Sequence, residues 1–141
     1  MARIIKILFI ISLLSVSFVQ IPKAAATGEQ LNLSTLITSQ NVSFENCYKV
    51  FNINNNTLFF LTISAINANR FHILETQSKS GYILFNAVNK PFFATIVSVN
   101  NNQGMLRITP ADGSYYFQPG IVLNIFKYID LNLDKKQEVI F

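Results

Sequence analysis

The sequence predicts an α+β domain of two layers, with two helices packed on one face of an antiparallel meander sheet of four to five strands. Residues 71–109 hold four runs rich in β-branched and aromatic residues, separated by short turn-like segments. One apolar stripe at helical spacing precedes these runs and another follows them. A length of 141 residues with 50% hydrophobic content fits one domain and excludes a disordered chain.

Residues 1–26 are predicted to be a signal peptide that is cleaved after Ala26. Arg3 and Lys6 precede an uncharged apolar run at residues 7–19, and three alanines supply the cleavage site. A helix over that run spans about 20 Å, less than the roughly 30 Å of a bilayer core. We therefore expect a periplasmic or extracellular product without stable membrane insertion. The alternative is an uncleaved membrane anchor over residues 4–21.

Cleavage would also change the charge of the protein. Arg3, Lys6 and Lys23 would leave, so the mature chain would keep eight basic residues against seven acidic residues. The remaining basic residues are scattered, and only Lys135 and Lys136 are adjacent. Because nucleic-acid affinity needs a basic surface that displaces counterions from phosphates, we expect no nucleic-acid binding.

The start of the mature chain gives weaker patterns. Residues 27–42 are predicted to be a lead-in segment, with a short strand where Leu31 and Leu33 alternate with polar residues. A helix is predicted from Ser43, its N-cap, to a run of three asparagines at residues 54–56. Its apolar stripe has the spacing of one helix face and consists of Phe44, Cys47, Tyr48 and Phe51.

Residues 57–66 are apolar almost throughout, which suits either a buried strand or a buried helix. Their phenylalanine, isoleucine and threonine content favours a strand, and this is our prediction, with the helix as the alternative.

The four β-rich runs cover residues 71–76, 82–88, 92–99 and 105–109. Short connections between them predict antiparallel pairing in sequence order. Within the third run, Ala94 and Ile96 point away from the face that carries Phe93 and Val97.

A last helix is predicted to begin near Pro119, followed by a polar tail over residues 131–141. Its apolar stripe consists of Ile121, Val122, Ile125, Phe126 and Ile129. The single α+β domain would then cover residues 43–130. In its order of elements this domain resembles helix-grip-like modules.

Chemistry-bearing residues are sparse. The chain has one cysteine and one histidine, so a nucleophilic dyad would have to pair Cys47 with His72. Asp112 lies in a turn, where its expected role is to accept hydrogen bonds from the backbone. Asp130, Asn132 and Asp134 match the start of a calcium-binding loop, but Lys135 stands where that loop needs glycine. We therefore predict no catalytic site, no metal and no cofactor.

The predicted function is that of an exported, non-enzymatic module that binds a protein. Tyr115, Tyr116 and Phe117 form the candidate binding surface, because aromatic residues are enriched at interfaces. One alternative is a carrier of a small apolar ligand between helices and sheet, and another is a small hydrolase that uses Cys47 and His72. Glycosylation sequons at Asn32, Asn41 and Asn55 are as frequent as chance allows and point to no function.

Overall fold

The structure, a computed structural model, describes residues 33–133 of the chain, which belong to a compact unit, Leu31–Phe141. The predicted signal peptide, the cleavage site after Ala26 and the Asn32 sequon lie outside the described residues. So does the tail from residue 134 onward.

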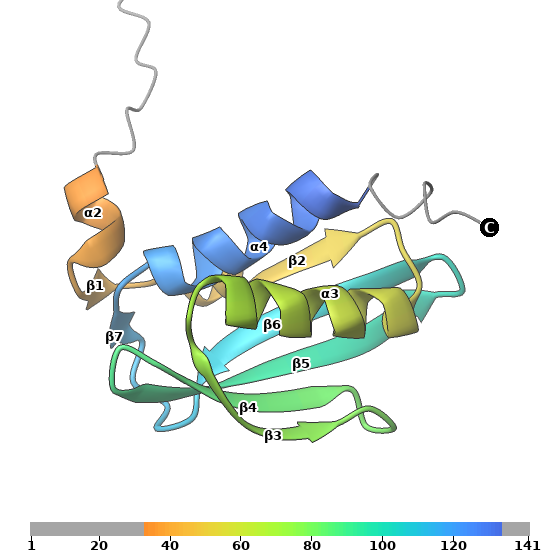
Figure 1. Cartoon of the computed structure of the whole chain (residues 1–141). Coiled ribbons are helices and arrows are strands. Elements are labelled where there is room, and N and C mark those ends of the chain that lie inside the picture. The colour runs from red at the N-terminus through yellow and green to blue at the C-terminus, as the bar shows by residue number, and fades with distance from the viewer. Residues whose placement is uncertain (1–32, 134–141) are drawn as a thin grey trace, which may run out of the picture. The chain divides into compact units, whose positions relative to one another are not determined.

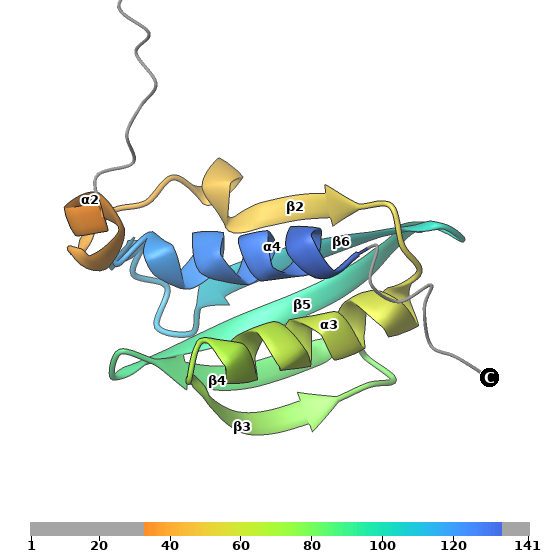
Figure 2. The ribbon, with the colours of Figure 1, turned by 45° about the horizontal axis from the view of Figure 1, so that its top comes forward.

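A two-layer α+β fold is confirmed, with α3 and α4 lying on one face of a five-stranded antiparallel sheet (Figures 1 and 2). A two-stranded sheet and a short helix lie at one end of α4 (Figure 1). The elements in chain order are α2 (Leu33–Ile37), β1 (Gln40–Asn41), the 3-10 helix η1 (Phe44–Cys47), β2 (Tyr48–Phe51), α3 (Asn55–Ala68), β3 (His72–Gln77), β4 (Tyr82–Ala87), β5 (Lys90–Asn100), β6 (Gln103–Pro110), β7 (Tyr116–Phe117) and α4 (Gly120–Asn132).

The predicted meander and last helix are confirmed. Strands β3 to β6 pair in sequence order, and every pair is antiparallel. The alternation also gives the right faces, since Ala94 and Ile96 are buried under the helices while Phe93 and Val97 point to the other side. Helix α4 buries the whole predicted stripe, which comprises Ile121, Val122, Ile125, Phe126 and Ile129.

The predicted helix from Ser43 to the asparagine run is wrong. Only one turn of 3-10 helix forms, and the chain then enters β2, which pairs with β6. Strand order β2-β6-β5-β4-β3 places the first strand of this sheet beside the last. Phe51 turns into the core, and Lys49 reaches Asp130 of α4 at 2.5 Å. Pairing with a strand more than 50 residues away thus overrides the local helical spacing.

The predicted strand over residues 57–66 is also wrong, because these residues lie within α3. Asn54 caps the helix, its side-chain oxygen accepting a hydrogen bond from the Thr57 N–H at 2.9 Å. The buried Thr62 hydroxyl donates a hydrogen bond to the Leu58 carbonyl oxygen at 2.7 Å, so its hydrogen-bonding capacity is met within the helix. The buried side chains recur at helical spacing and are Leu58, Phe59, Thr62, Ala65 and Ile66.

The start of the described chain forms α2, so the short strand predicted around Leu33 is wrong there. Helix α2 buries none of its residues, yet it packs on the start of α4. A Cβ atom added at Gly120 would lie 2.7 Å from the Leu36 carbonyl oxygen. Only glycine therefore lets the two helices approach this closely.

Aromatic rings run through the core between the layers. Successive centroids of Phe71, Phe85, Phe92 and Phe117 are 6.1, 5.7 and 5.1 Å apart. Phe85 and Phe92 are fully buried, as are Ile125 and Ile129 of α4. These contacts fill the space between sheet and helices around that row.

Candidate functional site

The five-stranded sheet has a second face, which we call the open face. It comprises the side chains that point away from α3 and α4, and no described helix covers it (Figures 1 and 2). Its members follow from the strand register and are Tyr48, Val50, His72, Glu75, Gln77, Tyr82, Leu84, Asn86, Pro91, Phe93, Thr95, Val97, Gln103, Met105, Arg107 and Thr109.

Apolar and aromatic side chains make up about half of this face, although the outward side of an antiparallel sheet is usually polar. Val50 pairs with Met105, which pairs with Val97, so the three form one row across β2, β6 and β5. Val50 is 44% exposed and Val97 is 41% exposed. Contiguous exposed apolar surface of this kind marks interaction sites in soluble proteins.

Arg107 lies within this apolar surface, between Tyr48 and Thr95 in the register. Its Nε atom is buried and has no hydrogen-bond partner among the described residues. The two ion pairs found in the described chain, Lys49–Asp130 and Lys90–Asp112, do not include it. Because burying a charge-bearing donor without a partner is unfavourable, this guanidinium is suited to an acceptor that comes from outside.

A carboxylate occupies the opposite edge of the open face. Glu75 accepts a hydrogen bond from the Gln77 amide at 2.9 Å. A hydrogen bond from Tyr82, with a smaller effect from Gln77, lowers the pKa of Glu75 and keeps it ionised. The same bond raises the pKa of the Tyr82 phenol, and the Tyr82 ring lies 5.8 Å from that of Phe93. The face therefore carries an anchored negative charge on β3 and a positive charge on β6.

The predicted binding surface at residues 115–117 is only partly available. Phe117 is 2% exposed and packs edge-on against Phe92, while Tyr115 is partly buried against Phe44. Tyr116, at 58% exposure, is the member that presents a surface. Phe117 is therefore part of the core and is not available to a partner. A binding role for Tyr116 stays a prediction.

Cys47 and His72 are not brought together. Cys47 directly precedes β2 at one edge of the sheet, whereas His72 begins β3 at the other edge. Four strand spacings of about 4.8 Å separate these edges by about 19 Å. Burial, with a smaller effect of Glu45, raises the pKa of the Cys47 thiol to about 11, which opposes a nucleophilic role. Asp112 accepts a hydrogen bond from the Ser114 N–H at 2.9 Å, as its turn predicts.

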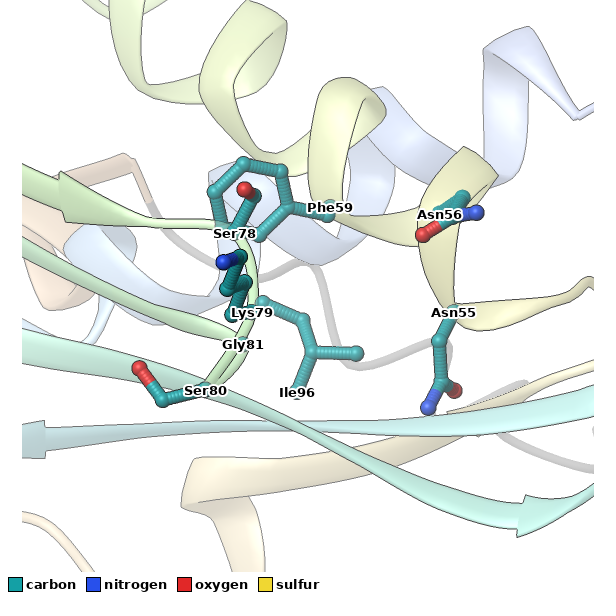
Figure 3. A pocket seen from close by; sticks show the side chains of 8 residues that line it. All are labelled: Asn55, Asn56, Phe59, Ser78, Lys79, Ser80, Gly81 and Ile96. Atoms are coloured by element: carbon teal, nitrogen blue, oxygen red, sulfur yellow. The ribbon is translucent and has the colours of Figure 1, made fainter.

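Figure 3 shows a pocket between the first turn of α3 and the β3–β4 hairpin, with a volume of about 190 Å³. Its lining consists of Asn55, Asn56, Phe59, Ser78, Lys79, Ser80, Gly81 and Ile96. Amides, hydroxyls and one ammonium group dominate it, and its volume is below the roughly 300–1,000 Å³ of typical ligand pockets. This pocket is too small and too polar for the predicted carrier of an apolar ligand.

The sequons within the described chain differ in their surroundings. Asn41 is exposed in β1, whereas the side-chain oxygen of Asn55 is buried without a partner. No group of three metal-ligating side chains occurs among residues 33–133. In the same part of the chain, no helix combines the length and apolar character needed to cross a membrane.

Comparison with known proteins gives no assignment: the chain matches no protein-family model and no curated protein sequence.

The open face was missed as a site, although its pattern is present in the sequence. Alternation placed Phe93 and Val97 on the side opposite Ala94 and Ile96, so apolar residues on both faces of β5 were visible. Which face of the sheet is covered depends on where the helices lie, and the prediction assigned the first of the two helices to the wrong residues.

Proposed function

We propose that this protein is an exported, non-enzymatic module that holds a protein partner on the open face of its sheet. The observation that carries the proposal is the apolar row of Val50, Met105 and Val97, in which the two valines are exposed and Met105 is half-buried. An exposed apolar row on an uncovered sheet face suits another protein surface better than it suits a small molecule, which needs a concave pocket. The close packing between helices and sheet supports the same choice over a ligand carrier.

A photo-crosslinking phenylalanine analogue tests this surface in cells that express the full chain. It is placed at Val97 on the open face and, as a matched control, at Phe60, which is 59% exposed on α3. We expect protein adducts from position 97 and none from position 60. Adducts from both positions, or from position 60 alone, would contradict the proposal.

Export is tested on the same cells. We expect the protein in the periplasmic or extracellular fraction with an N-terminus at Thr27. A retained Met1 would instead support an uncleaved anchor.

A further inference from the structure

We propose that the partner is a second copy of this chain, and that the two open faces pack against each other about a two-fold axis. The axis runs along the strands, midway between β4 and β5. This inference rests on the proposed function, because it names the protein that occupies the open face.

The charges on the open face are the first argument. In the order β2-β6-β5-β4-β3, strands β6 and β3 are equally far from the midline between β5 and β4. A two-fold axis on that midline therefore places β6 of one copy over β3 of the other. Arg107 then faces the strand that carries Glu75 in the second copy, and the symmetry repeats the pair.

The register brings these two charges within reach. Arg107 shares a row with Thr95 and Tyr82, and Glu75 lies in the next row, beside Leu84. That offset is two residues, or about 7 Å along a strand, and packed sheets also cross at about 30°. An arginine side chain spans such an offset, so the guanidinium of Arg107, whose Nε lacks a partner, gains a carboxylate that is already ionised.

The residues nearest the axis are the second argument. Strands β4 and β5 flank it, and they carry Tyr82, Leu84 and Phe93 on the open face. These side chains would meet their own counterparts in the second copy. An aromatic and apolar centre with charged pairs outside it is the usual anatomy of a protein interface.

The size of the face is the third argument. The proposed axis superposes four strands, β6, β5, β4 and β3, and leaves β2 outside the overlap. Four strands about 4.8 Å apart are about 19 Å wide, and a strand of β6's length runs about 27 Å. Two such faces would cover roughly 1,000 Å² in total, at the lower end of the range of specific complexes. Two-fold dimers are also the commonest assemblies of identical chains, and they require a self-complementary surface.

Charge reversal tests the arrangement, using the protein purified after expression of the full chain. Its mass in solution is measured by light scattering and sedimentation over micromolar to sub-millimolar concentration. We expect a wild-type dimer, and monomers for Arg107→Glu and for Glu75→Arg, because each variant opposes like charges twice. An equimolar mixture of these two variants should form a heterodimer, since both pairs are then opposite in charge.

Two further variants keep the test independent of folding. Lys127→Glu changes the net charge equally but lies on the exposed side of α4, so it should stay dimeric. Val97→Lys alters a side chain that is already 41% exposed, and it should abolish the dimer in a folded protein even if Arg107→Glu fails to fold. Circular dichroism and urea midpoints report whether each variant is folded.

Three results would overturn the inference: a monomeric wild type, a dimer that survives Val97→Lys, or folded charge-reversal variants that do not combine. None of them overturns the proposed function, which the crosslinks decide separately. An adduct at position 97 with twice the mass of the chain supports a second copy. An adduct with any other mass keeps the open face as a binding surface and replaces the partner.

Discussion

Gly81 ends the β3–β4 hairpin with a left-handed backbone, at a φ of 68°. A Cβ atom there would lie 2.6 Å from the Ile96 carbonyl oxygen. We expect Gly81→Ala to lower the free energy of unfolding by the cost of left-handed geometry, about 1–2 kcal/mol, plus about 1–3 kcal/mol for the clash. Gly113 has a φ of 73° and open space around it, so Gly113→Ala should lower the free energy of unfolding only by the cost of left-handed geometry. Urea midpoints compare the two, and equal midpoints would contradict the clash.

Cys47 is a second residue whose surroundings set its chemistry. Its thiol is fully buried and lies 3.5 Å from the Ser43 carbonyl oxygen, and its pKa is raised to about 11. We expect a thiol reagent at neutral pH to label the protein only after unfolding in urea. Rapid labelling of the folded protein would contradict the burial. Because the folded-state pKa is raised, the associated stability should be present at neutral pH and be lost as pH rises towards 11.

Asp112 provides a pH test of opposite sign. Hydrogen bonding from the Ser114 N–H, and then from Lys90, lowers the pKa of Asp112. The stability that comes with this shift is present above the ordinary aspartate pKa of about 3.9 and is lost as pH falls through the lowered value. Asp112→Asn keeps an acceptor but cannot titrate, so its urea midpoint should change less than that of wild type on acidification. Parallel acid profiles would contradict this role.

Among the elements, α4 buries an apolar stripe that reaches the sheet at Phe51 of β2. Phe126 is 6% exposed and its ring centroid lies 6.1 Å from that of Phe51 on β2. Phe126→Ala should therefore cost about 3–5 kcal/mol of unfolding free energy. Lys127→Ala, on the next residue and facing water, should change it by less than about 0.5 kcal/mol. Urea denaturation of the two variants checks the orientation of the helix, and matching midpoints would count against it.

Which elements could be read from the sequence depended on where their partners lie. The meander was predictable because hairpins pair close neighbours and the alternation of Ala94 and Ile96 with Phe93 and Val97 fixes the faces. The stripe of α4 was predictable because polar residues border it. In contrast, Tyr48 and Phe51 fit a helix face and a strand equally well over so short a segment, and distant β6 decided between them.

The helix α3 was hidden for a different reason. Residues 57–66 are apolar on nearly every side, so neither period stands out. The available signals were Asn54 as N-cap and the helical recurrence of Leu58, Thr62 and Ala65. The expectation of two helices on one face was thus correct, although one of them was assigned to the wrong residues. The same error hid the open face as a site.

At the scale of the whole molecule, stability should be distributed unevenly. Strands β5 and β6 lie inside the sheet and under the helices, whereas α2 buries no side chain and β1 pairs only two residues. In native-state hydrogen exchange we expect the amides of β5 and β6 to open only with global unfolding. The amides of α2 and β1 should exchange through separate local openings that need less free energy. Equal protection of all four elements would mean that α2 and β1 belong to the same cooperative unit as β5 and β6.

The pairing of β2 with β6 has a consequence for a chain that emerges N-terminus first. A nascent chain that has delivered β2 and α3 still lacks the strand that β2 needs, and it lacks α4 to cover the result. This long-range pairing makes completion of the sheet wait until β6 has been synthesised, since the loop between the two strands must first be complete. In the export that we propose, the chain would therefore stay unfolded during translocation and would close its sheet only on the far side of the membrane.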